Sequence, residues 1–432
     1  MDEYREHLSL SRKEESLRVE LLRIRKTASF RFGNHFVRAI ERPWRIFLLP
    51  FTIPALLIDI YKSTRKPHSQ ITYPVRNCIV AFSSSSNRGL HFDRINALLS
   101  EFNDPAIQLI HISIDESGVF KELDTVKYYF FPGRTNIPHM NPRIWNQQCE
   151  AILNAVLDNY APSTFIFDGD YPFRGMLNSI KIRNELNRYW IRESSSNYKT
   201  SSLPFDGFEH FDAVIHPSFS KNSDPDMNVG TCGTIFCNPI LGERVADESR
   251  ESFRNKYLPP DSQLVFLDVG SLTGQFEPLI DELMDREDVY LLTTPKMKHS
   301  KIRHHLRTIE YEGLEYFKAI GYCDAAVLYP DFFSVCSVFR DNIPALCLIE
   351  SKQFLDSLYT EFDSRNLPLI TVETENLDEL IHTAVDRLLS TDVQKQLKER
   401  MQEITVDYDQ EQLVKLIMSF HEVTHKIEEP SL

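Results

Sequence analysis

The sequence has few cysteines, and none of them is arranged as a metal site or a disulfide framework would require. Its 432 residues contain seven cysteines, an odd number without C-x-x-C spacing. Several lie inside apolar runs such as Ala345–Ile349, which is typical of small buried side chains in a reducing compartment. Cys232 and Cys237 are close in sequence, but no second Cys or His pair has ligand spacing, so we expect no bound metal. The seven are Cys78, Cys149, Cys232, Cys237, Cys323, Cys336 and Cys347.

Most of the chain also lacks positive charge. Residues 75–432 carry 34 Lys and Arg against 54 Asp and Glu, whereas residues 1–74 carry 14 against 8. A protein that binds nucleic acid needs a basic face, so the acidic body argues against a nucleic-acid partner. The basic first segment requires a separate explanation.

This first segment lacks an apolar run long enough to cross a membrane. The stretch Ile46–Ile60 contains Pro50 and Pro54 and is interrupted by Asp59, whereas a spanning helix needs about 20 apolar residues. The run begins late and follows a long charged segment, which argues against a signal peptide. We therefore interpret it as interfacial or re-entrant.

What the first segment does contain is a mixture of cations and apolar side chains. A narrow apolar seam among charges of both signs over Leu8–Ile24 predicts a helix. Within Phe30–Leu49, aromatic and aliphatic residues are interleaved with arginines, opposed only by Glu41. This pattern is typical of a helix that lies in an anionic membrane surface; the alternative is a helical hairpin packed on the body or on a second subunit. The polar stretch Lys62–Pro74 is interpreted as a linker.

From Val75 onward, short apolar strands alternate with helical segments in two successive halves. The alternation predicts an α/β fold with a mainly parallel, doubly wound sheet in each half. We predict a helical membrane-associating segment over 1–74, a Rossmann-like domain over 75–240 and a second one over 241–432. Residues 219–245, rich in Ser, Asn, Asp and Gly, form the predicted junction, and the helical tail Val393–Glu428 is expected to pack back across the cleft.

Eleven strands carry this prediction. In the first half they are Cys78–Phe82, Ile107–Ile114, Val126–Phe131, Thr164–Asp168, Tyr189–Arg192 and Ala213–His216. In the second half they are Gln263–Val269, Val289–Thr293, Ala325–Tyr329, Ala345–Ile349 and Leu367–Val372. Helical spacing is clearest over Phe92–Phe102, Trp145–Asn159 and Leu377–Leu389.

Polar residues follow several strands of the first half, where parallel sheets bind their ligands. The loop after the first strand carries Arg88 and leads to His91, which is placed to act as a general base, although a lone histidine is more often structural. Asp168 and Arg174 share the loop after the fourth strand, and Glu193 follows the fifth. These groups suit deprotonation and orientation of an acceptor hydroxyl; the alternative is ordinary solvated turns.

The second half offers loops suited to phosphate. Gly270, Ser271 and Thr273 lie between a strand and a helix, where small residues let amide N–H groups reach an anionic oxygen. Ser334 opens a later helix and suits a diphosphate, the alternative being a helix cap. Glu350 follows the next strand and suits hydrogen bonds from sugar hydroxyls. No metal is required, because helix dipoles and N–H groups can neutralise a leaving diphosphate.

Taken together, these segments resemble the GT-B glycosyltransferases, particularly the MurG-like group that adds N-acetylglucosamine to a lipid-linked acceptor. The resemblance is carried by Arg88–Arg94, Leu264–Gly274, Arg307–Tyr311 and Asp324–Ile349. It implies a donor side with Gly270, Ser271 and Thr273 near phosphate, Ser334 near the diphosphate, Tyr311 near the base and Glu350 at the sugar. It implies an acceptor side with His91 or Asp168 as the base, Arg174 as the orienting cation, and Arg88 and Glu193 nearby.

Three positions depart from the family pattern. The first loop has a single glycine where the family has several, Asp331 stands in place of a glycine, and Ser337 stands in place of a carboxylate. The resemblance nevertheless implies transfer of a sugar from a nucleoside diphosphate donor to a lipid-linked or glycan acceptor, without a further cofactor. The expected location is cytoplasmic, peripheral to the inner face of the membrane. The rival interpretations are a sugar-nucleotide 2-epimerase and a non-catalytic partner subunit.

Overall fold

The computed structural model divides the chain into two compact units, residues 1–72 and 73–432. The predicted membrane-associating segment lies outside the residues that the structure describes, as do the linker and its boundary at residue 74. The described residues are 76–84, 90–114, 123–133, 137, 140–183, 185–192, 208–218, 233–268, 276–293, 307–310, 316–349, 356, 359, 362, 367–404 and 410–426.

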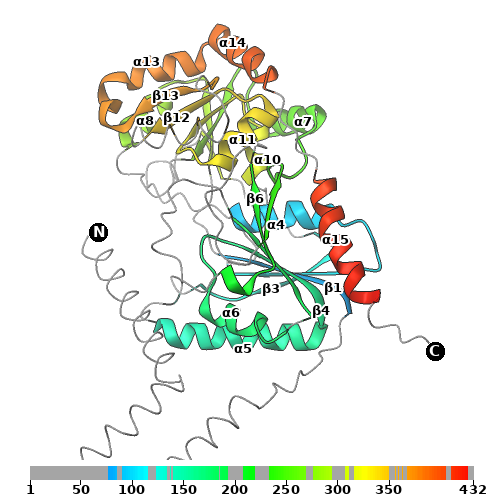
Figure 1. The fold of residues 1–432 in the computed structure, drawn as a ribbon. Coiled ribbons are helices and arrows are strands. Elements are labelled where there is room, and N and C mark those ends of the chain that lie inside the picture. The colour runs from blue at the N-terminus through cyan, green and yellow to red at the C-terminus, as the bar shows by residue number, and fades with distance from the viewer. Residues whose placement is uncertain are drawn as a thin grey trace, which may run out of the picture. The chain divides into compact units, whose positions relative to one another are not determined.

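The first half of the second unit forms a parallel sheet (Figure 1). Its strand order among the described residues is β3-β2-β1-β4-β5-β6-β7. Its central strands arise from short apolar runs whose side chains are buried on both faces, as is typical of parallel sheets, whereas the edge strands β3 and β7 are partly exposed. Its elements are β1 (Arg76–Ser83), α4 (Leu90–Ser100), β2 (Gln108–Ser113), β3 (Val126–Phe130), α5 (Pro142–Tyr160), β4 (Pro162–Asp168), α6 (Arg174–Ile180), β5 (Asn187–Ile191), the 3-10 turn η4 (Phe208–His210), β6 (Ala213–Pro217) and β7 (Gly233–Cys237).

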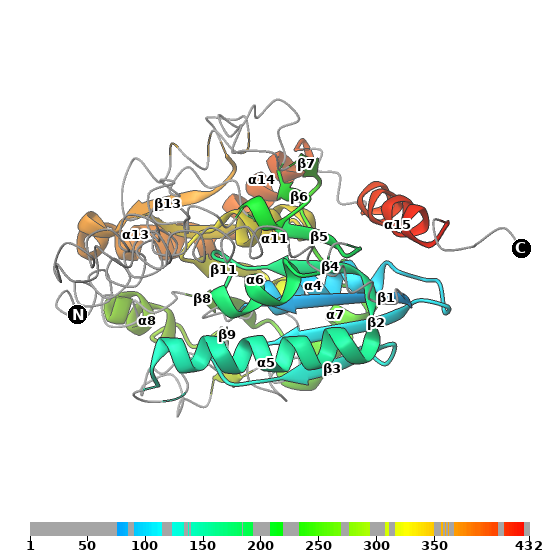
Figure 2. The same cartoon turned by 60° about the horizontal axis from the view of Figure 1, so that its bottom comes forward.

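Helices cover both faces of this sheet. α5 and α6 lie along one face, where Trp145 and Leu177 enter the core (Figure 2). The close approach of these two helices requires Gly175, because a Cβ atom there would lie 2.1 Å from the carbonyl oxygen of Asn146. α4 covers the other face through residues such as Leu98, together with the last helix of the chain, α15 (Glu411–Lys426).

The second half forms another parallel sheet, with strand order β10-β9-β8-β11-β12-β13 in the described part of the chain. α8 and α13 pack on one face and α10 and α11 on the other. Its elements are α7 (Asp247–Tyr257), β8 (Gln263–Asp268), α8 (Glu277–Met284), β9 (Val289–Thr293), β10 (Thr308–Glu310), α10 (Tyr316–Gly321), β11 (Ala325–Leu328), α11 (Phe332–Asp341), β12 (Ala345–Ile349), β13 (Ile370–Glu373), the 3-10 turn η6 (Thr374–Asn376), α13 (Leu377–Leu389) and α14 (Thr391–Gln402).

The structure confirms the predicted pair of parallel α/β sheets and corrects one detail. The predicted junction at residues 219–245 contains the strand β7, which pairs with β6 at the edge of the first sheet. Its composition concealed it, because β7 begins with Gly233 and its side chains are exposed or only half-buried. The tail is confirmed as helical: α14 packs on the second sheet, whereas α15 buries Leu413 and Ile417 on the first.

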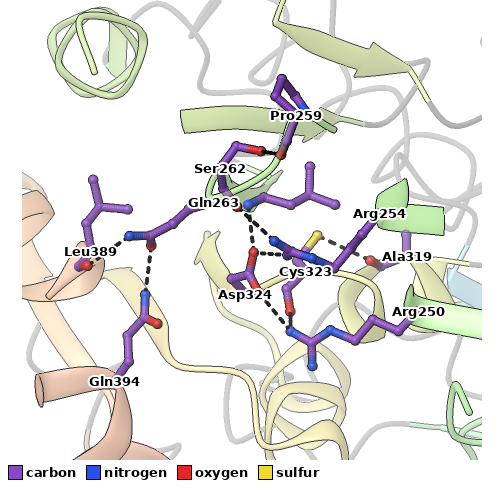
Figure 3. Close-up of polar contacts among 11 residues, drawn as sticks. Arg250, Arg254, Pro259, Ser262, Gln263, Ala319, Cys323, Asp324, Leu389 and Gln394 are labelled. Carbon is purple, nitrogen blue, oxygen red and sulfur yellow. Dashed lines mark hydrogen bonds and ion pairs between the residues drawn. The ribbon is translucent and has the colours of Figure 1, made fainter. Parts of the chain in front are cut away.

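An ion-pair network fixes the amino ends of the central strands of the second sheet (Figure 3). Asp324, just before β11, accepts hydrogen bonds from Arg250 at 3.1 Å, from Arg254, and from the amide of Leu264 at 2.8 Å. Arg254 also donates to the carbonyl oxygen of Ser262 at 2.8 Å. The network therefore joins α7 to β8 and β11, on the edge opposite the carboxyl ends of the strands.

None of the helices within the described ranges is long and apolar enough to cross a bilayer.

We predict that Asp324→Ala lowers the free energy of unfolding by about 2 kcal/mol, because it removes the carboxylate partner of two arginines and leaves a strand amide without its acceptor. Urea denaturation measures the change. Asp158→Ala is the control: it removes the partner of Arg183, but its carboxylate is 57% exposed against 21% for Asp324, so a loss of about 0.5 kcal/mol is expected. Equal losses of unfolding free energy in the two variants would contradict a structural role of the Asp324 network greater than that of an exposed ion pair.

Candidate active site

The candidate site lies where β1 and β4 end, side by side in the first sheet. The register pairs Ser83 with Asp168, so the last residues of the two strands are neighbours. α4 begins at Leu90, after the loop that follows β1, and carries His91 in its first turn. The topology thus brings together two residues that are 77 positions apart in sequence.

Asp168 holds two side chains of α4. Its Oδ1 lies 2.8 Å from Nδ1 of His91, and its Oδ2 accepts a hydrogen bond from Nε of Arg94 at 2.6 Å. A second nitrogen of the Arg94 guanidinium donates to Oδ1, which makes the Asp168–Arg94 pair bidentate. Asp168 is fully buried, and Arg94 and His91 are nearly so. A buried group of ionisable side chains at the end of a strand is a common feature of functional sites.

Nδ1 of His91 lies between an acceptor and a donor. The ionised carboxylate of Asp168, 2.8 Å away, can only accept, whereas a guanidinium nitrogen of Arg94, 2.9 Å from the same Nδ1, can only donate. We assign the proton of the neutral ring to Nδ1, facing the carboxylate, which leaves the lone pair on Nε2. Nε2 lies 3.9 Å from a carboxylate oxygen of Asp170, whose side chain is 54% exposed. The ring therefore keeps its basic nitrogen on the side away from Asp168.

The charges around His91 shift its pKa upward. Burial is the largest single influence and opposes protonation, as Arg94 does, but attraction to Asp168 and the hydrogen bond to it outweigh them, with help from Asp170. Burial would likewise raise the pKa of Asp168, yet Arg94 and His91 together hold it below its ordinary value of 3.8. The cluster at neutral pH thus contains an ionised Asp168.

These shifts contribute to stability in opposite pH ranges. The contribution of His91 is fully present below pH 6.5 and is lost as pH rises through its raised folded-state pKa. The contribution of Asp168 is present above pH 3.8 and is lost as pH falls through its lowered folded-state pKa. Together they favour the folded state most in mildly acidic solution.

A second polar chain supports α4 beneath the cluster. Ser83 lies 2.9 Å from Nε2 of His111, whose Nδ1 is 3.0 Å from the side-chain oxygen of Asn96 on α4. His111 is fully buried, which lowers its pKa to about 3, so it remains neutral near pH 7. The ring of Phe92 stacks on His111 with centroids 4.6 Å apart. This packing fixes the rotation of α4, and with it the direction in which His91 points.

We call the first sheet with its helices the first lobe and the second sheet with its helices the second lobe. In the second lobe, the described residues show how α11, the helix proposed to bind phosphate, begins. Asp331 is the N-cap of α11, and its side chain accepts from the amide of Ser334 at 2.8 Å. The hydroxyl of Ser334 lies 2.9 Å from the amide of Asp331, which completes a capping box. Helix capping is therefore present here, with Asp331 as the cap, and Ser334 is fully buried. Its proposed diphosphate contact stays a prediction.

The structure brings together two of the residues that the sequence selected, His91 and Asp168. Arg174 is the first residue of α6 and is half-buried; its orienting role stays a prediction. In the described ranges, no three His, Cys, Asp or Glu side chains are grouped as a metal site would need. The remaining predicted residues lie outside the described part of the chain: Arg88, Glu193, Gly270, Ser271, Thr273, Tyr311 and Glu350.

Sequence reasoning did not select Asp93 and Arg94 as site residues. Arg94 is three positions after His91 on α4, the spacing that places two side chains on one face of a helix. The spacing could therefore have identified Arg94 from the sequence. No sequence pattern identifies Asp93, because its partner is the amide of Tyr316, 223 positions away in sequence and 2.5 Å away in space.

The comparisons with known proteins agree on the fold. No protein-family model matches the sequence, and no curated protein matches it. Among solved structures, the spinosyn forosaminyltransferase has a TM-score of 0.51 at 11% identity, over 80% of this chain and 99% of its own. A putative UDP-N-acetylglucosamine 2-epimerase from Listeria monocytogenes has a TM-score of 0.50 at 14% identity, over 83% and 98%.

A third match carries a nucleotide. The structure of a UGT transferase from Siraitia grosvenorii in complex with UDP has a TM-score of 0.50 at 11% identity, over 81% of this chain and all of its own. This chain has the GT-B fold. The resemblance found in the sequence is confirmed at the level of that fold, and the MurG-like subgroup stays a prediction.

We predict that nuclear magnetic resonance titration gives His91 a pKa above 6.5 in the wild type and below 6.5 in Asp168→Asn. The substitution leaves burial and Arg94 opposed only by Asp170. His111 is an internal control, since burial holds its pKa far below 6.5 and loss of the Asp168 charge, which raises that pKa, can only lower it further. A His91 pKa that did not move in Asp168→Asn would show that Asp168 does not set its protonation.

Proposed function

We propose that this GT-B protein is a glycosyltransferase that moves a hexosyl or N-acetylhexosaminyl group from a nucleoside diphosphate sugar to an acceptor hydroxyl. The observation that carries the proposal is the His91–Asp168 pair, with Nδ1 and Oδ1 2.8 Å apart, at the carboxyl edge of the first sheet. This edge is where open parallel sheets bind ligands. The match to a UDP complex of the same fold supports a nucleotide sugar as the donor.

In this proposal His91 acts as the general base. Nε2 takes the proton of the acceptor hydroxyl while the acceptor oxygen bonds to the anomeric carbon of the donor. The bond from that carbon to the diphosphate oxygen breaks, and its electron pair leaves with the diphosphate. Asp168 orients the ring and stabilises the imidazolium that forms, the part that a buried carboxylate plays in other His–Asp pairs. Because only neutral His91 accepts the proton, the rate should rise with pH through its raised pKa.

The donor would bind at the carboxyl edge of the second sheet. We assign Gly270, Ser271 and Thr273 to the phosphates, Tyr311 to the base and Glu350 to the sugar, with Ser334 near the diphosphate. The assignment is supported by the end of β8 at Asp268, two residues before Gly270, which puts Gly270 after the carboxyl end of a strand. On the first lobe, Arg88, Arg174 and Glu193 would orient the acceptor.

The acceptor is proposed to be a lipid-linked or glycan molecule at a membrane surface. The support is the charge of residues 1–74, which carry a net excess of cations interleaved with aromatic side chains, against an acidic body. The protein would then be cytoplasmic and peripheral to the inner face of the membrane.

The second candidate is a sugar-nucleotide 2-epimerase, which the match to the putative epimerase of the same fold favours. Such an enzyme acts on the donor alone, without an acceptor. A non-catalytic binding partner is the remaining alternative. It would bind a nucleotide sugar and release no product.

We predict that a thermal-shift panel of uridine, guanosine, cytidine and thymidine diphosphate sugars identifies a stabilising donor. With that donor and a membrane extract as acceptor, His91→Gln should lower the turnover rate about 10²- to 10⁴-fold, since it removes the base. His382→Gln is the matched control because His382 is 68% exposed, on α13. Release of nucleoside diphosphate measures turnover.

The alternatives give different results in the same experiment. Isomerisation of the sugar without acceptor would establish the epimerase, and binding without any turnover would establish the non-catalytic partner. If no diphosphate sugar stabilises the protein, the donor site is wrong. Equal rates for His91→Gln and the wild type would exclude His91 as the base.

We also predict that the full-length protein floats with liposomes containing anionic lipid and that a fourfold variant of its first segment floats much less. The variant replaces Arg31, Arg38, Arg42 and Arg45 by Gln, each cation near an anionic surface contributing about 1 kcal/mol. The control carries the same number of Gln substitutions at exposed cations of the body, namely Arg143, Lys181, Lys256 and Lys395. Equal flotation of the two variants would contradict a membrane role of the first segment.

A further inference from the structure

Helix α4 belongs to the first lobe but contacts both lobes. Its residues His91 and Arg94 bind Asp168 at the end of β4. Its first residue, Leu90, belongs to the apolar core of the second lobe. Asp93, between these residues, accepts a hydrogen bond from the amide of Tyr316, the first residue of α10, at 2.5 Å. One turn of helix thus holds the candidate base and a cross-lobe contact.

The contact of Asp93 continues to the candidate phosphate loop. The hydroxyl of Tyr316 donates to Oδ2 of Asp268 at 2.6 Å. Asp268 is the last residue of β8 and directly precedes the loop that contains Gly270. Asp93, Tyr316 and Asp268 are all nearly fully buried. Two hydrogen bonds in series therefore join α4 to the strand end at which the donor phosphates are proposed to bind.

A cation–ring contact runs parallel to this path. The guanidinium carbon of Arg94 lies 4.1 Å from the centre of the Phe333 ring, on α11 of the second lobe. The same guanidinium holds both oxygens of Asp168. A displacement of the second lobe would therefore act on Asp93 and Arg94 together, in the turn that carries His91.

We propose that Asp93 is a positioning residue, which couples nucleotide binding at the carboxyl end of β8 to the placement of the His91 imidazole. The proposal rests on the proposed function for the identity of the ligand, while the contact itself is independent of it. Losing the acceptor of a buried amide is costly, because the amide is left without a partner. A movement of α4 that shifts Asp93 also moves His91, because the two residues lie within one turn of the helix. By thermodynamic linkage, if nucleotide binding strengthens the Asp93–Tyr316 hydrogen bond, that hydrogen bond strengthens nucleotide binding by the same free energy.

The contact is tested first without any ligand, by hydrogen–deuterium exchange of the intact protein. In Asp93→Ala the amide of Tyr316 should exchange at least about tenfold faster, since its acceptor is gone. Asp93→Asn, which keeps an acceptor oxygen without the charge, should give an intermediate rate. Asp104→Ala is the matched control: it removes a carboxylate that accepts from the amide of Ala106 at 2.8 Å within the first lobe. Unchanged exchange at Tyr316 in both Asp93 variants would overturn the contact.

The coupling is tested by adding UDP while observing the ring of His91 by nuclear magnetic resonance. UDP should shift the His91 signals in the wild type and in Asp104→Ala. In Asp93→Ala the shift should be lost and UDP should bind more weakly, and Asp93→Asn should restore part of both. A full His91 response in Asp93→Ala would overturn the coupling. Circular dichroism confirms that each variant is folded, and Asp93→Asn serves alone if Asp93→Ala is not.

The two experiments separate this inference from the proposed function. If no nucleotide binds the wild type, the proposed function and the coupling fail together, while the exchange result still decides whether Asp93 holds α10. If UDP binds and shifts His91 equally in all variants, the proposed function stands and the coupling alone is wrong.

Discussion

The arrangement of the first lobe depends on one buried carboxylate. Asp168 has no access to water and so must be compensated by its neighbours, which Arg94 does with two hydrogen bonds and His91 with one. The same pairing orients the His91 ring and ties α4 to the end of β4. His111, which its own burial keeps neutral, supports α4 from below and fixes the rotation of that helix.

Much of the fold could be predicted from the sequence, because each buried strand is a short apolar run and each covering helix has one apolar face. The strand β7 was missed since its residues are only partly buried and follow a glycine. His91 and Asp168 were selected separately, by their positions after strands, but only the strand order makes β1 and β4 neighbours. Asp93 could not be found in this way, because its partner depends on how two lobes meet. The cap of α11 was placed on Ser334, whereas Asp331 has the extended backbone that a cap requires.

The acceptor and donor sites are proposed to lie on different lobes, but α4 contacts both lobes. Its apolar first residue lies in the core of the second lobe, its charged residues bind the first, and Arg94 contacts both. A short helix with such different neighbours has little freedom to shift, since any movement that relieves one contact strains another. This explains why a helix of 11 residues carries four nearly buried polar side chains, His91, Asp93, Arg94 and Asn96.

The position of α15 has a consequence for how the protein is made. Leu413 and Ile417 fill the core of the first sheet, beside residues of α4 that precede them by more than 300 positions. During synthesis the first lobe leaves the ribosome early, with α4 but not α15 available to cover this face. The part of the core that Leu413 and Ile417 fill is therefore open to solvent until the whole second lobe has been translated.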